Sequence, residues 1–514
     1  MRPPFKKAPQ VNSKAQQLLV HSQALLAEGL ALHQQGELAA AQQRYAQVLQ
    51  LNPQHFDALH LMGVLASQIQ QPERAVALIQ QAIKINSKVA GAFINLGVAL
   101  RQLKKYTEAV EAYDQALRLQ PQDADTLVNR GVALRALTLH DQALDSYNRA
   151  LALQPQKLEA FYNRGLLFND LNRLPEAIDD FEATLASRPD YHPARWGQTL
   201  CHLQLGQLAL GWQMYKIRWL QDEKEFTTRP LVTSRPQYLA GTQVDRLLIW
   251  PEQGVGDELM WGALLQQAQA CTRELLVQMD QRLIPMFQRV LPTVKFFPKH
   301  VAVDENLYGA HLPMGDLAGL FCVEFEDFKR IQPRYVMADP LRVEALHQIL
   351  ASNDTRPLCG ISWRSKNERK GQDRSIALKD LLQAIDPRQV RFVNLQYGDV
   401  SNEIAQLQQD LGIEVFQCPG VDTHNDLDGL AALIEACDFV VSADNSTVHL
   451  AGALGQPVSV LLPFNADWRW FMNRSDSPWY PSVTLYRQDA LGDWSSPLAQ
   501  LHSDVKNKYS HHHG

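Results

Sequence analysis

The chain is poor in the features that mark membrane, secreted and nucleic-acid-binding proteins. Its 514 residues contain no apolar run near the roughly 18 residues that a membrane-spanning helix needs, so no span is expected. The six cysteines have no close-paired spacing, which disfavours a disulfide framework and a thiolate metal site and suits a reducing compartment. A net charge of −6 is mild for this length and gives no electrostatic case for binding nucleic acid.

The N-terminus also lacks the pattern of a targeting signal. Residues 1–20 carry basic side chains without a long apolar segment behind them, which disfavours a signal peptide and predicts a flexible N-terminal segment. Hydrophobic residues make up 46% of the chain, enough for several cores. A cytoplasmic protein of more than one domain is therefore expected.

What the sequence does contain is a repeat of 34 residues. Each repeat has a glycine, an alanine 12 residues later and a large, mostly aromatic residue 16 later. The repeat glycines are Gly29, Gly63, Gly97, Gly131 and Gly165. Glycine and alanine let two antiparallel helices touch, and the large residue fills the space between hairpins. The pattern is typical of tetratricopeptide repeats and predicts an α solenoid over 21–220, with five clear repeats and a degenerate sixth.

The sixth unit departs from the pattern. Thr199 stands where the glycine belongs and Gly211 where the alanine belongs. Terminal repeats are often atypical because one face meets something other than a repeat. Its aromatic residues are therefore predicted to pack on the next domain; they are Trp196, Trp212, Tyr215 and Trp219. The charged, proline-dotted stretch 221–245 is predicted to be a connector.

Beyond residue 245, short apolar runs alternate with helical segments. The runs are 246–250, 275–279, 294–297, 358–363, 390–396, 413–418, 437–443 and 458–463. This alternation is typical of parallel sheets covered by helices on both faces. A proline-bearing stretch at 338–357 divides the runs, so we expect two Rossmann-type α/β lobes facing a cleft, at 246–340 and 355–500.

The strongest site candidate is the segment 442–455, where a predicted strand leads through a polar turn into a helix that begins near Asn445. Ligands of parallel sheets bind at the carboxyl ends of strands, and the free N–H groups of a helix start favour phosphate. Ser446 and Thr447 add hydroxyl groups, and His449 falls on the same helical face as Ser446. An equally good alternative is a simple helix cap beside a histidine at the edge of the core.

A basic segment, 363–374, directly follows the predicted strand 358–363, and five of its twelve residues are Lys or Arg. Such a loop can neutralise a diphosphate. Arg364 and Lys366, nearest the strand end, are the preferred candidates, while the other basic residues are expected to be solvated. Gln396 ends the next strand and is expected to face the same cleft.

The segment 251–261 lies in the other predicted lobe. Gly254 and Gly256 permit a tight turn from strand to helix, with Asp257 and Glu258 at its rim. A leucine stands where a dinucleotide-binding fingerprint needs its third glycine, which disfavours a Rossmann cofactor. A carboxylate here could act as a general base across the cleft. Alternatively, both carboxylates only complement the helix dipole.

Aromatic residues gather near the C-terminus, at 463–481. They could flank a nucleotide base or a sugar, with Arg469 as an anion partner. Core packing or contact between the lobes is the favoured interpretation.

These segments, over about residues 240–500, resemble GT-B glycosyltransferases related to bacterial ADP-heptose heptosyltransferases. Those enzymes carry an Asp-x-Gly-x-x-His segment, matched by Asp444 to His449 with Ser446 in place of the glycine. They also carry a Gly-Asp pair, matched by Gly256 and Asp257. The resemblance implies inverting, metal-independent transfer from a nucleotide-diphosphate sugar, with Asp257 deprotonating the acceptor and His449 assisting. The serine leaves the identity of the sugar open.

The resemblance and the residue types together define a predicted donor site, with no cofactor beyond the sugar nucleotide. Its residues are Arg364, Lys366, Gln396, Asp444, Asn445, Ser446, Thr447 and His449.

A repeat superhelix fused to a GT-B unit is also similar in layout to O-GlcNAc transferase. Asn95, Asn129 and Asn163 recur two residues before the repeat glycine, as in the asparagine ladder of that enzyme. Side-chain amides can pair with a peptide backbone of any sequence, so these three are the candidate acceptor-binding residues. Asparagine is common at this position in such repeats, which slightly favours a purely structural role.

Three functions remain open. The first is a glycosyltransferase acting on a protein or peptide held by the concave face of the repeats. The second is a scaffold whose α/β region has lost activity. The third is a transferase acting on lipopolysaccharide or another glycan, which the repeats disfavour because such arrays usually bind peptides or helices.

Overall fold

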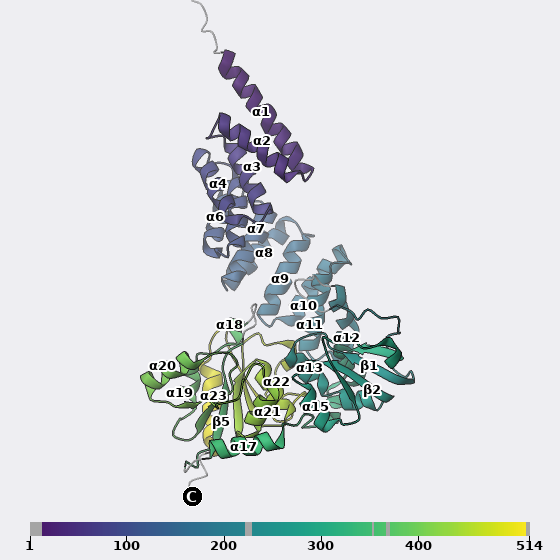
Figure 1. The fold of residues 1–514 in the computed structure, drawn as a ribbon. Helices are drawn as coiled ribbons and strands as arrows, with labels where there is room; N and C mark the ends of the chain where they lie inside the picture. Colours follow the sequence, from purple (N-terminus) through teal and green to yellow (C-terminus); the bar gives the residue numbers. More distant parts are fainter. Residues whose placement is uncertain (1–12, 221–228, 352–353, 366–370, 510–514) are drawn as a thin grey trace, which may run out of the picture. The chain divides into compact units, whose positions relative to one another are not determined.

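The computed structural model describes residues 13–220, 229–351, 354–365 and 371–509 (Figure 1). Contacts divide the chain into two compact units, Met1–Tyr191 and His192–Gly514. The predicted segment 1–20, the connector 221–245 and the basic segment 363–374, which contains Lys366, fall at least partly outside the described residues.

The first unit is a series of five helical hairpins (Figure 1). Its helices are α1 (Ser13–Gln34), α2 (Leu38–Leu51), α3 (Phe56–Gln68), α4 (Pro72–Ile85), α5 (Ala90–Gln102), α6 (Tyr106–Leu119), α7 (Ala124–Ala136), α8 (His140–Leu153), α9 (Leu158–Asp170) and α10 (Leu174–Ser187). Each second helix packs on the first helix of its own hairpin, and α2, α4, α6 and α8 also pack on the first helix of the next hairpin. The predicted solenoid is confirmed.

The repeat glycines explain how the hairpins close. A Cβ atom added at Gly97 would lie 2.5 Å from Cε1 of Tyr113, which is fully buried. The other repeat glycines face the equivalent large residue of their own hairpin in the same way. The repeat alanines, such as Ala109, are also fully buried where the two helices touch. The 34-residue pattern therefore records the contacts inside each hairpin.

The second unit opens with a further hairpin made of α11 (His192–Gln204), α12 (Leu208–Met214) and the 3₁₀ helix η1 (Tyr215–Leu220). The ring of Trp212 lies 5.7 Å from Trp261 and 5.5 Å from Trp468, which belong to the α/β region. The expectation that this aromatic end packs on the next domain is confirmed. The hairpin predicted as a sixth repeat thus belongs to the α/β unit by its contacts.

The first sheet of this unit is parallel, with the strand order β3-β2-β1-β4. Its strands are β1 (Val244–Trp250), β2 (Thr272–Met279), β3 (Lys295–Pro298) and β4 (Ala310–Pro313). The helices of this lobe are α13 (Val255–Gly262), α14 (Leu265–Gln269), α15 (Ile284–Val290), η2 (Glu305–Leu307), η3 (Met314–Asp316), α16 (Leu317–Phe321) and η4 (Phe325–Arg330).

The second sheet is also parallel, with the strand order β10-β9-β8-β5-β6-β7. Its strands are β5 (Leu358–Ser362), β6 (Arg391–Asn394), β7 (Val415–Phe416), β8 (Phe439–Ala443), β9 (Val458–Leu462) and β10 (Val483–Arg487). The helices around it are α17 (Pro340–Leu350), α18 (Gly371–Arg374), α19 (Leu378–Ala384), α20 (Ser401–Leu411), α21 (Leu427–Glu435), α22 (Ser446–Ala453), η5 (Trp468–Trp470) and α23 (Ser495–Tyr509).

Alternate residues of the central strands enter two separate cores. In β8, Val440 belongs to the core that includes α21 and α22, whereas Val441 belongs to the core that includes α19 and α23. Burial on both faces accounts for the continuous apolar runs of these strands. The predicted fold class, a repeat solenoid followed by two Rossmann-type lobes, is confirmed.

Among the described residues, no helix combines the length and the apolar character that crossing a bilayer requires. None of the six cysteines, all of which lie among the described residues, forms a disulfide bond.

Candidate functional site

Both sheets reverse their strand order beside their first strand. β1 lies between β2 and β4, and β5 lies between β6 and β8. Crevices that bind ligands form at the carboxyl ends of strands where the order reverses. The turn 251–254 after β1 and the turns after β5 and β8 therefore lie at the two points where this topology favours a ligand.

The turn after β8 is fixed by Asn445. Its side-chain oxygen accepts the N–H of Thr447 at 2.9 Å and so caps α22. Its amide nitrogen donates to Oγ of Ser362 at 2.7 Å and to the carbonyl of Arg364 at 3.0 Å. Thr447 is buried, and Ser446 is partly exposed at the first turn. Asn445 therefore acts as a helix cap and also joins the ends of β5 and β8.

Gln396, predicted to touch the donor, is 1% exposed and holds the loop after β5. Its oxygen accepts the backbone N–H groups of Trp363 and Arg364, both at 2.8 Å. Its amide nitrogen donates to the carbonyl of Arg364 at 3.2 Å. These bonds fix the backbone that carries Arg364, and a direct contact with the donor stays a prediction.

A chain of alternating carboxylates and guanidinium groups joins the two lobes. Asp444 lies 3.3 Å from Arg374, which lies 3.2 Å from Asp467. Asp467 lies 2.6 Å from Arg469, and Arg469 also pairs with Asp257. The two arginine side chains are only 16% and 15% exposed. Because the groups are mostly desolvated, each charge depends on its partners. We call these five residues the bridging network.

Asp257 is the member of this network that belongs to the N-terminal lobe. Its Oδ2 accepts the N–H of Gly254 at 3.2 Å, which caps α13, while its Oδ1 faces Arg469. Arg469 also donates to the side-chain oxygen of Gln253 at 3.1 Å. Asp257 thus caps the start of α13 with one oxygen and faces the C-terminal lobe with the other. The same position fits both interpretations drawn from the sequence.

Glu258 has a different environment from its neighbour. It is 1% exposed, and its Oε2 accepts the N–H of Asp280 at 2.5 Å. Burial raises the pKa of Glu258 to about 7, against the opposing effects of that hydrogen bond and of Lys299. Its contacts place it in the fold of the N-terminal lobe rather than in the bridging network.

His449 is buried beneath the network. Its Nδ1 lies 2.8 Å from the hydroxyl of Tyr480, and its ring stacks on Trp470 at 5.4 Å. Burial lowers the pKa of His449, although Asp444 acts in the opposite direction, so the imidazole is mainly neutral at pH 7. A Cβ atom added at Gly256 would lie 3.0 Å from Cδ2 of His449. Gly256, in the first turn of α13, therefore lies close against the imidazole, and a side chain there would require the ring to shift by a few tenths of an ångström.

Two residues of the bridging network were not among the candidates preferred from the sequence. Arg374, and not Arg364, is the residue of the basic segment that pairs with Asp444. Arg364 instead lies 3.1 Å from Glu403, and Lys366 lies outside the described residues. Asp467 was not identified from the sequence. The Asp-x-Arg spacing of residues 467–469 was the available signal, because it allows one residue to hold the other.

Two cavities flank this region. One, of about 400 Å³, lies at the carboxyl ends of β6 and β7 and is lined by Asn394, Gln417 and His424 among others. Thr423, also on its wall, donates to the carbonyl of Gln396 at 3.0 Å. This cavity therefore adjoins the loop that Gln396 fixes.

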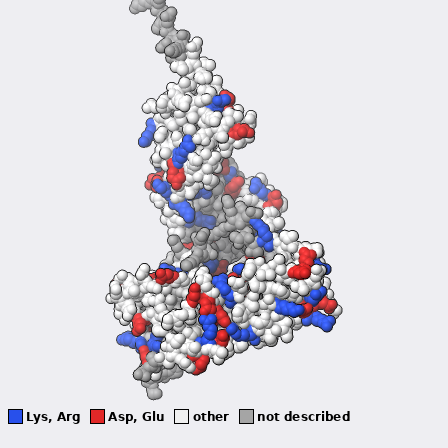
Figure 2. Space-filling view, viewed as in Figure 1, with Lys and Arg blue, Asp and Glu red and all other residues white. Residues whose placement is uncertain are grey.

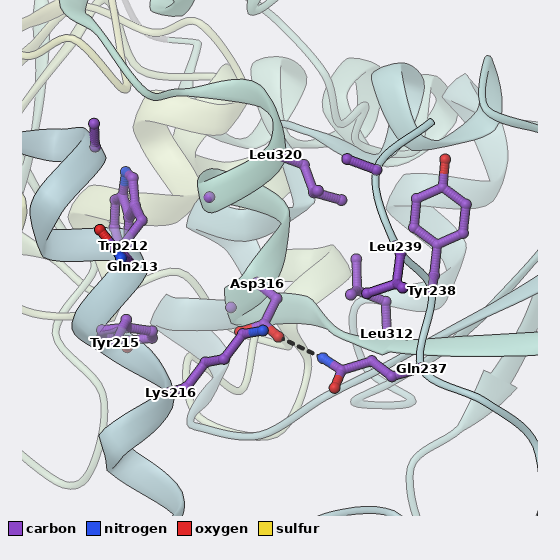
Figure 3. Close-up of a pocket in the computed structure, with 14 residues that line it drawn as sticks. Trp212, Gln213, Tyr215, Lys216, Gln237, Tyr238, Leu239, Leu312, Asp316 and Leu320 are labelled. Carbon is purple, nitrogen blue, oxygen red and sulfur yellow. Dashed lines mark hydrogen bonds between the residues drawn. The ribbon is translucent and has the colours of Figure 1, made fainter. Parts of the chain in front are cut away.

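The other cavity, of about 300 Å³, lies in the N-terminal lobe between the α12–η1 helix and residues 237–240 (Figure 3). Tyr215 and Lys216 line one side, and Asp316 accepts a hydrogen bond from Gln237 at 2.8 Å. The hydroxyl of Tyr215 also accepts from Gln253 at 3.1 Å. Since Gln253 contacts Arg469, one residue separates this cavity from the bridging network.

The three asparagines predicted to bind the acceptor lie in the first unit and are half-buried. Asn95 is 2.9 Å from the Nε2 of His60, and Asn163 donates to the carbonyl of Glu159, one turn back in its own helix, at 2.7 Å. A role of Asn95, Asn129 and Asn163 in binding stays a prediction.

Charge is distributed without a single-sign field on the face shown in Figure 2, where Lys and Arg are interspersed with Asp and Glu. In the part of the chain that the structure describes, no group of three or more His, Cys, Asp or Glu side chains is arranged to hold a metal ion.

Comparison with known families agrees with the repeat unit. The family described as Tetratricopeptide repeat matches residues 32–92, 90–123 and 128–192. The N-terminal part is therefore a tetratricopeptide-repeat array, an architecture that serves protein–protein interaction.

Protein FlbA of Caulobacter vibrioides is 30% identical over 325 residues, which cover 59% of this chain and 53% of that protein. The chain thus spans about half the length of this curated relative. Among solved structures, MamA is 22% identical over 31% of this chain and 94% of its own, with a TM-score of 0.30. The pilF protein of Pseudomonas aeruginosa is 18% identical over 41% of this chain and 94% of its own, with a TM-score of 0.35.

Proposed function

We propose that the second unit is a glycosyltransferase that moves a sugar from a nucleotide-diphosphate donor to a peptide bound by the repeats. The observation that carries the proposal is the bridging network, which gathers two arginines and three carboxylates at the carboxyl edges of two parallel sheets. Such edges are where open α/β sheets bind nucleotides.

The C-terminal lobe offers the parts that a donor needs. The diphosphate would lie at the first turn of α22, near Ser446, where helix N–H groups favour anions. Arg374 lies close enough to reach it because it already contacts Asp444, the residue before the cap. The cavity at the ends of β6 and β7 has room for the nucleoside.

The N-terminal lobe offers the base. In the proposed reaction an acceptor hydroxyl attacks the anomeric carbon as the bond to the β-phosphate oxygen breaks. Asp257 takes the hydroxyl proton, and the nucleoside diphosphate leaves with the bonding electron pair. Arg374 and the start of α22 stabilise its new charge. A single displacement of this kind inverts the anomeric centre, and no metal enters the scheme.

The proposal also explains how Asp257 could be released from its ion pair with Arg469. Arg469 is shared between Asp257 and Asp467 in the structure. A diphosphate carries more negative charge than a carboxylate and competes for the same guanidinium groups. Donor binding would therefore draw Arg469 toward the phosphates and release Asp257 to accept a proton.

A test uses the full chain, a panel of nucleotide sugars and an assay for released nucleoside diphosphate. At least one donor should be consumed, and Asp257→Asn should lower the rate by about 100-fold or more while nucleotide binding is kept. Asp489→Asn, on an exposed loop, is the matched control and should leave the rate unchanged. Nucleotide binding without consumption of any donor by the parent protein would support an inactive scaffold instead.

A further inference from the structure

The first helices of the repeat hairpins are linked by side-chain pairs 35 residues apart. One member of each pair stands four residues after a repeat glycine, and the other stands five residues after the next one. The hydrogen-bonded pairs are His33 with Gln68 (2.7 Å), Ser67 with Gln102 (2.8 Å) and Arg135 with Asp170 (2.5 Å). We call this series the polar ladder. It runs along α1, α3, α5, α7 and α9.

The ladder lies on the inner side of the array. First helices of successive hairpins contact one another directly, whereas each second helix contacts first helices. In a curved stack the elements that approach their equivalents most closely are on the concave side, where repeat arrays bind extended partners. The ladder therefore borders the surface expected to bind a peptide.

The ladder has one break, at Arg101. Its partner position is occupied by Ala136, whose side chain has no polar atom. Among the described residues, no carboxylate lies within ion-pair distance of Arg101, and its buried Nε has no hydrogen-bond partner. A cation at this position is thus left without the counter-charge that the next pair in the ladder has.

The other arginines of the first helices provide a comparison. Each pairs with an aspartate: Arg130 with Asp114 (2.7 Å), Arg135 with Asp170 (2.5 Å) and Arg164 with Asp180 (2.7 Å). The charge of each of these three arginines is therefore balanced by an aspartate of the array, across first helices for Arg135 and from a second helix for Arg130 and Arg164. Arg101 is the exception among these four residues.

Two buried tyrosine hydroxyl groups lie near Arg101. The arginine lies beside the buried hydroxyl of Tyr113, just as His33 lies 3.2 Å from that of Tyr45 in the first hairpin. Burial raises the pKa of Tyr113 to about 12, although the charge of Arg101 acts in the opposite direction. The hydroxyl of Tyr147, which also feels this charge, is buried and has no hydrogen-bond partner among the described residues. The hydroxyl groups near Arg101 are neutral and do not compensate its charge.

We propose that Arg101 is the anchor for a carboxylate of a peptide bound along the first helices. The carboxylate would occupy the place beside Arg101 that Asp170 occupies beside Arg135, and would supply the missing member of the ladder. The inference rests on the peptide-binding role given to the repeats in the proposed function, and it names the chemistry of the acceptor. An acidic side chain and a free C-terminus share this chemistry.

The test measures binding of the full chain to immobilised ten-residue peptides of alanine, serine and leucine. Each carries a single Asp, Asn or Lys, scanned through all positions, and each is made with a free and with an amidated C-terminus. The parent protein should bind the best Asp peptide, or the free C-terminus, about tenfold more tightly than its neutral counterpart. Loss of the preference on amidation assigns it to the C-terminal carboxylate, and retention assigns it to the side chain.

Three variants make the test specific. Arg101→Gln should lose the preference. Ala136→Asp should lose it too, because the new carboxylate pairs with Arg101, and its unfolding temperature should be unchanged or raised, which separates the effect from misfolding. Arg149→Gln, an exposed arginine on the second helix α8, removes the same charge and should keep the preference.

No preference in the parent, or an equal preference in Ala136→Asp, would overturn the proposal. The assay contains no nucleotide sugar, so its result is independent of whether the second unit transfers a sugar. Failure of the peptide anchor and failure of the glycosyltransferase proposal are therefore seen in different experiments.

Discussion

Arg469 holds Asp257 and Asp467 at the same time, and this sharing determines what the candidate base can do. The guanidinium is mostly buried, with the two carboxylates at 20% exposure. Removing one member of such a cluster leaves the others desolvated and unpaired, which costs more than the pair contributed. Arg469 therefore affects both the stability of the second unit and the proposed role of Asp257.

Replacement of Arg469 is the first prediction. Arg469→Gln should destabilise the second unit by about 3 to 5 kcal/mol, because two buried carboxylates lose their counter-charge. All ten tryptophans lie between residues 192 and 514, so tryptophan fluorescence during urea unfolding reports on this unit. Arg388→Gln, whose side chain is 88% exposed beside Asp386, should cost less than about 1 kcal/mol. Equal losses in both variants would be inconsistent with the network.

Glu258 gives a prediction with a defined pH dependence. Burial raises the pKa of Glu258 from its ordinary value of 4.5 to about 7, so between these pH values the folded state holds a proton that the unfolded state has released. The stability that this proton provides is complete below pH 4.5 and is lost as the pH rises to about 7, a change of up to about 3 kcal/mol. Glu258→Gln should flatten the loss of stability of the second unit between pH 5 and 7.5. If the pH dependence of stability were the same in Glu258→Gln and the parent, the pKa of Glu258 would not be raised in the folded state.

At the scale of elements, the repeat glycines set how closely two helices approach. Alanine normally stabilises a helix relative to glycine by about 1 kcal/mol. At Gly97 the added methyl group would overlap the fully buried ring of Tyr113, and such overpacking costs about 1 to 3 kcal/mol. The steric overlap, and not helix propensity, should therefore decide whether alanine at this position stabilises or destabilises the repeat unit.

Two glycines of the same helix, α5, test this. Gly97→Ala should lower the unfolding temperature of the helical signal, followed by circular dichroism. Gly91→Ala, where the nearest atom to the added Cβ is 3.9 Å away, should leave it unchanged or raise it. If both substitutions lowered it alike, close packing would not be the reason for the glycine pattern.

The elements also show what the sequence could predict. All eight apolar runs became strands. The central ones, such as β8, are buried on both faces, which makes them apolar throughout. β4 and β10 were not predicted. β4 is only four residues long and contains a histidine, and β10 alternates buried and exposed residues at its start, so neither carries a long apolar run.

The candidate site was predictable to a similar degree. Asp257 and the segment after β8 were found because turns after strands have local patterns. The pairing of Arg374 with Asp444 depends on how distant loops fold over the sheet, and no local pattern encodes it. Proximity along the chain favoured Arg364, which the structure places beside Glu403.

At the scale of the whole molecule, the account assigns acceptor binding to the repeats and chemistry to the second unit. Ala136→Asp should then raise the KM for an acidic peptide about tenfold, since the anchor is occupied, and leave donor hydrolysis without peptide unchanged. Paired assays of peptide transfer and of donor hydrolysis check this. Equal changes in both rates would mean that the substitution disturbs the second unit as well.

The most direct measurement of the central claim is mass spectrometry of a peptide library incubated with the full chain and a set of nucleotide sugars. The account predicts peptides heavier by one sugar, formed by the parent protein and absent with Asp257→Asn, while Asp489→Asn forms them normally. Unmodified peptides in every reaction, or equal modification by the parent and Asp257→Asn, would contradict it.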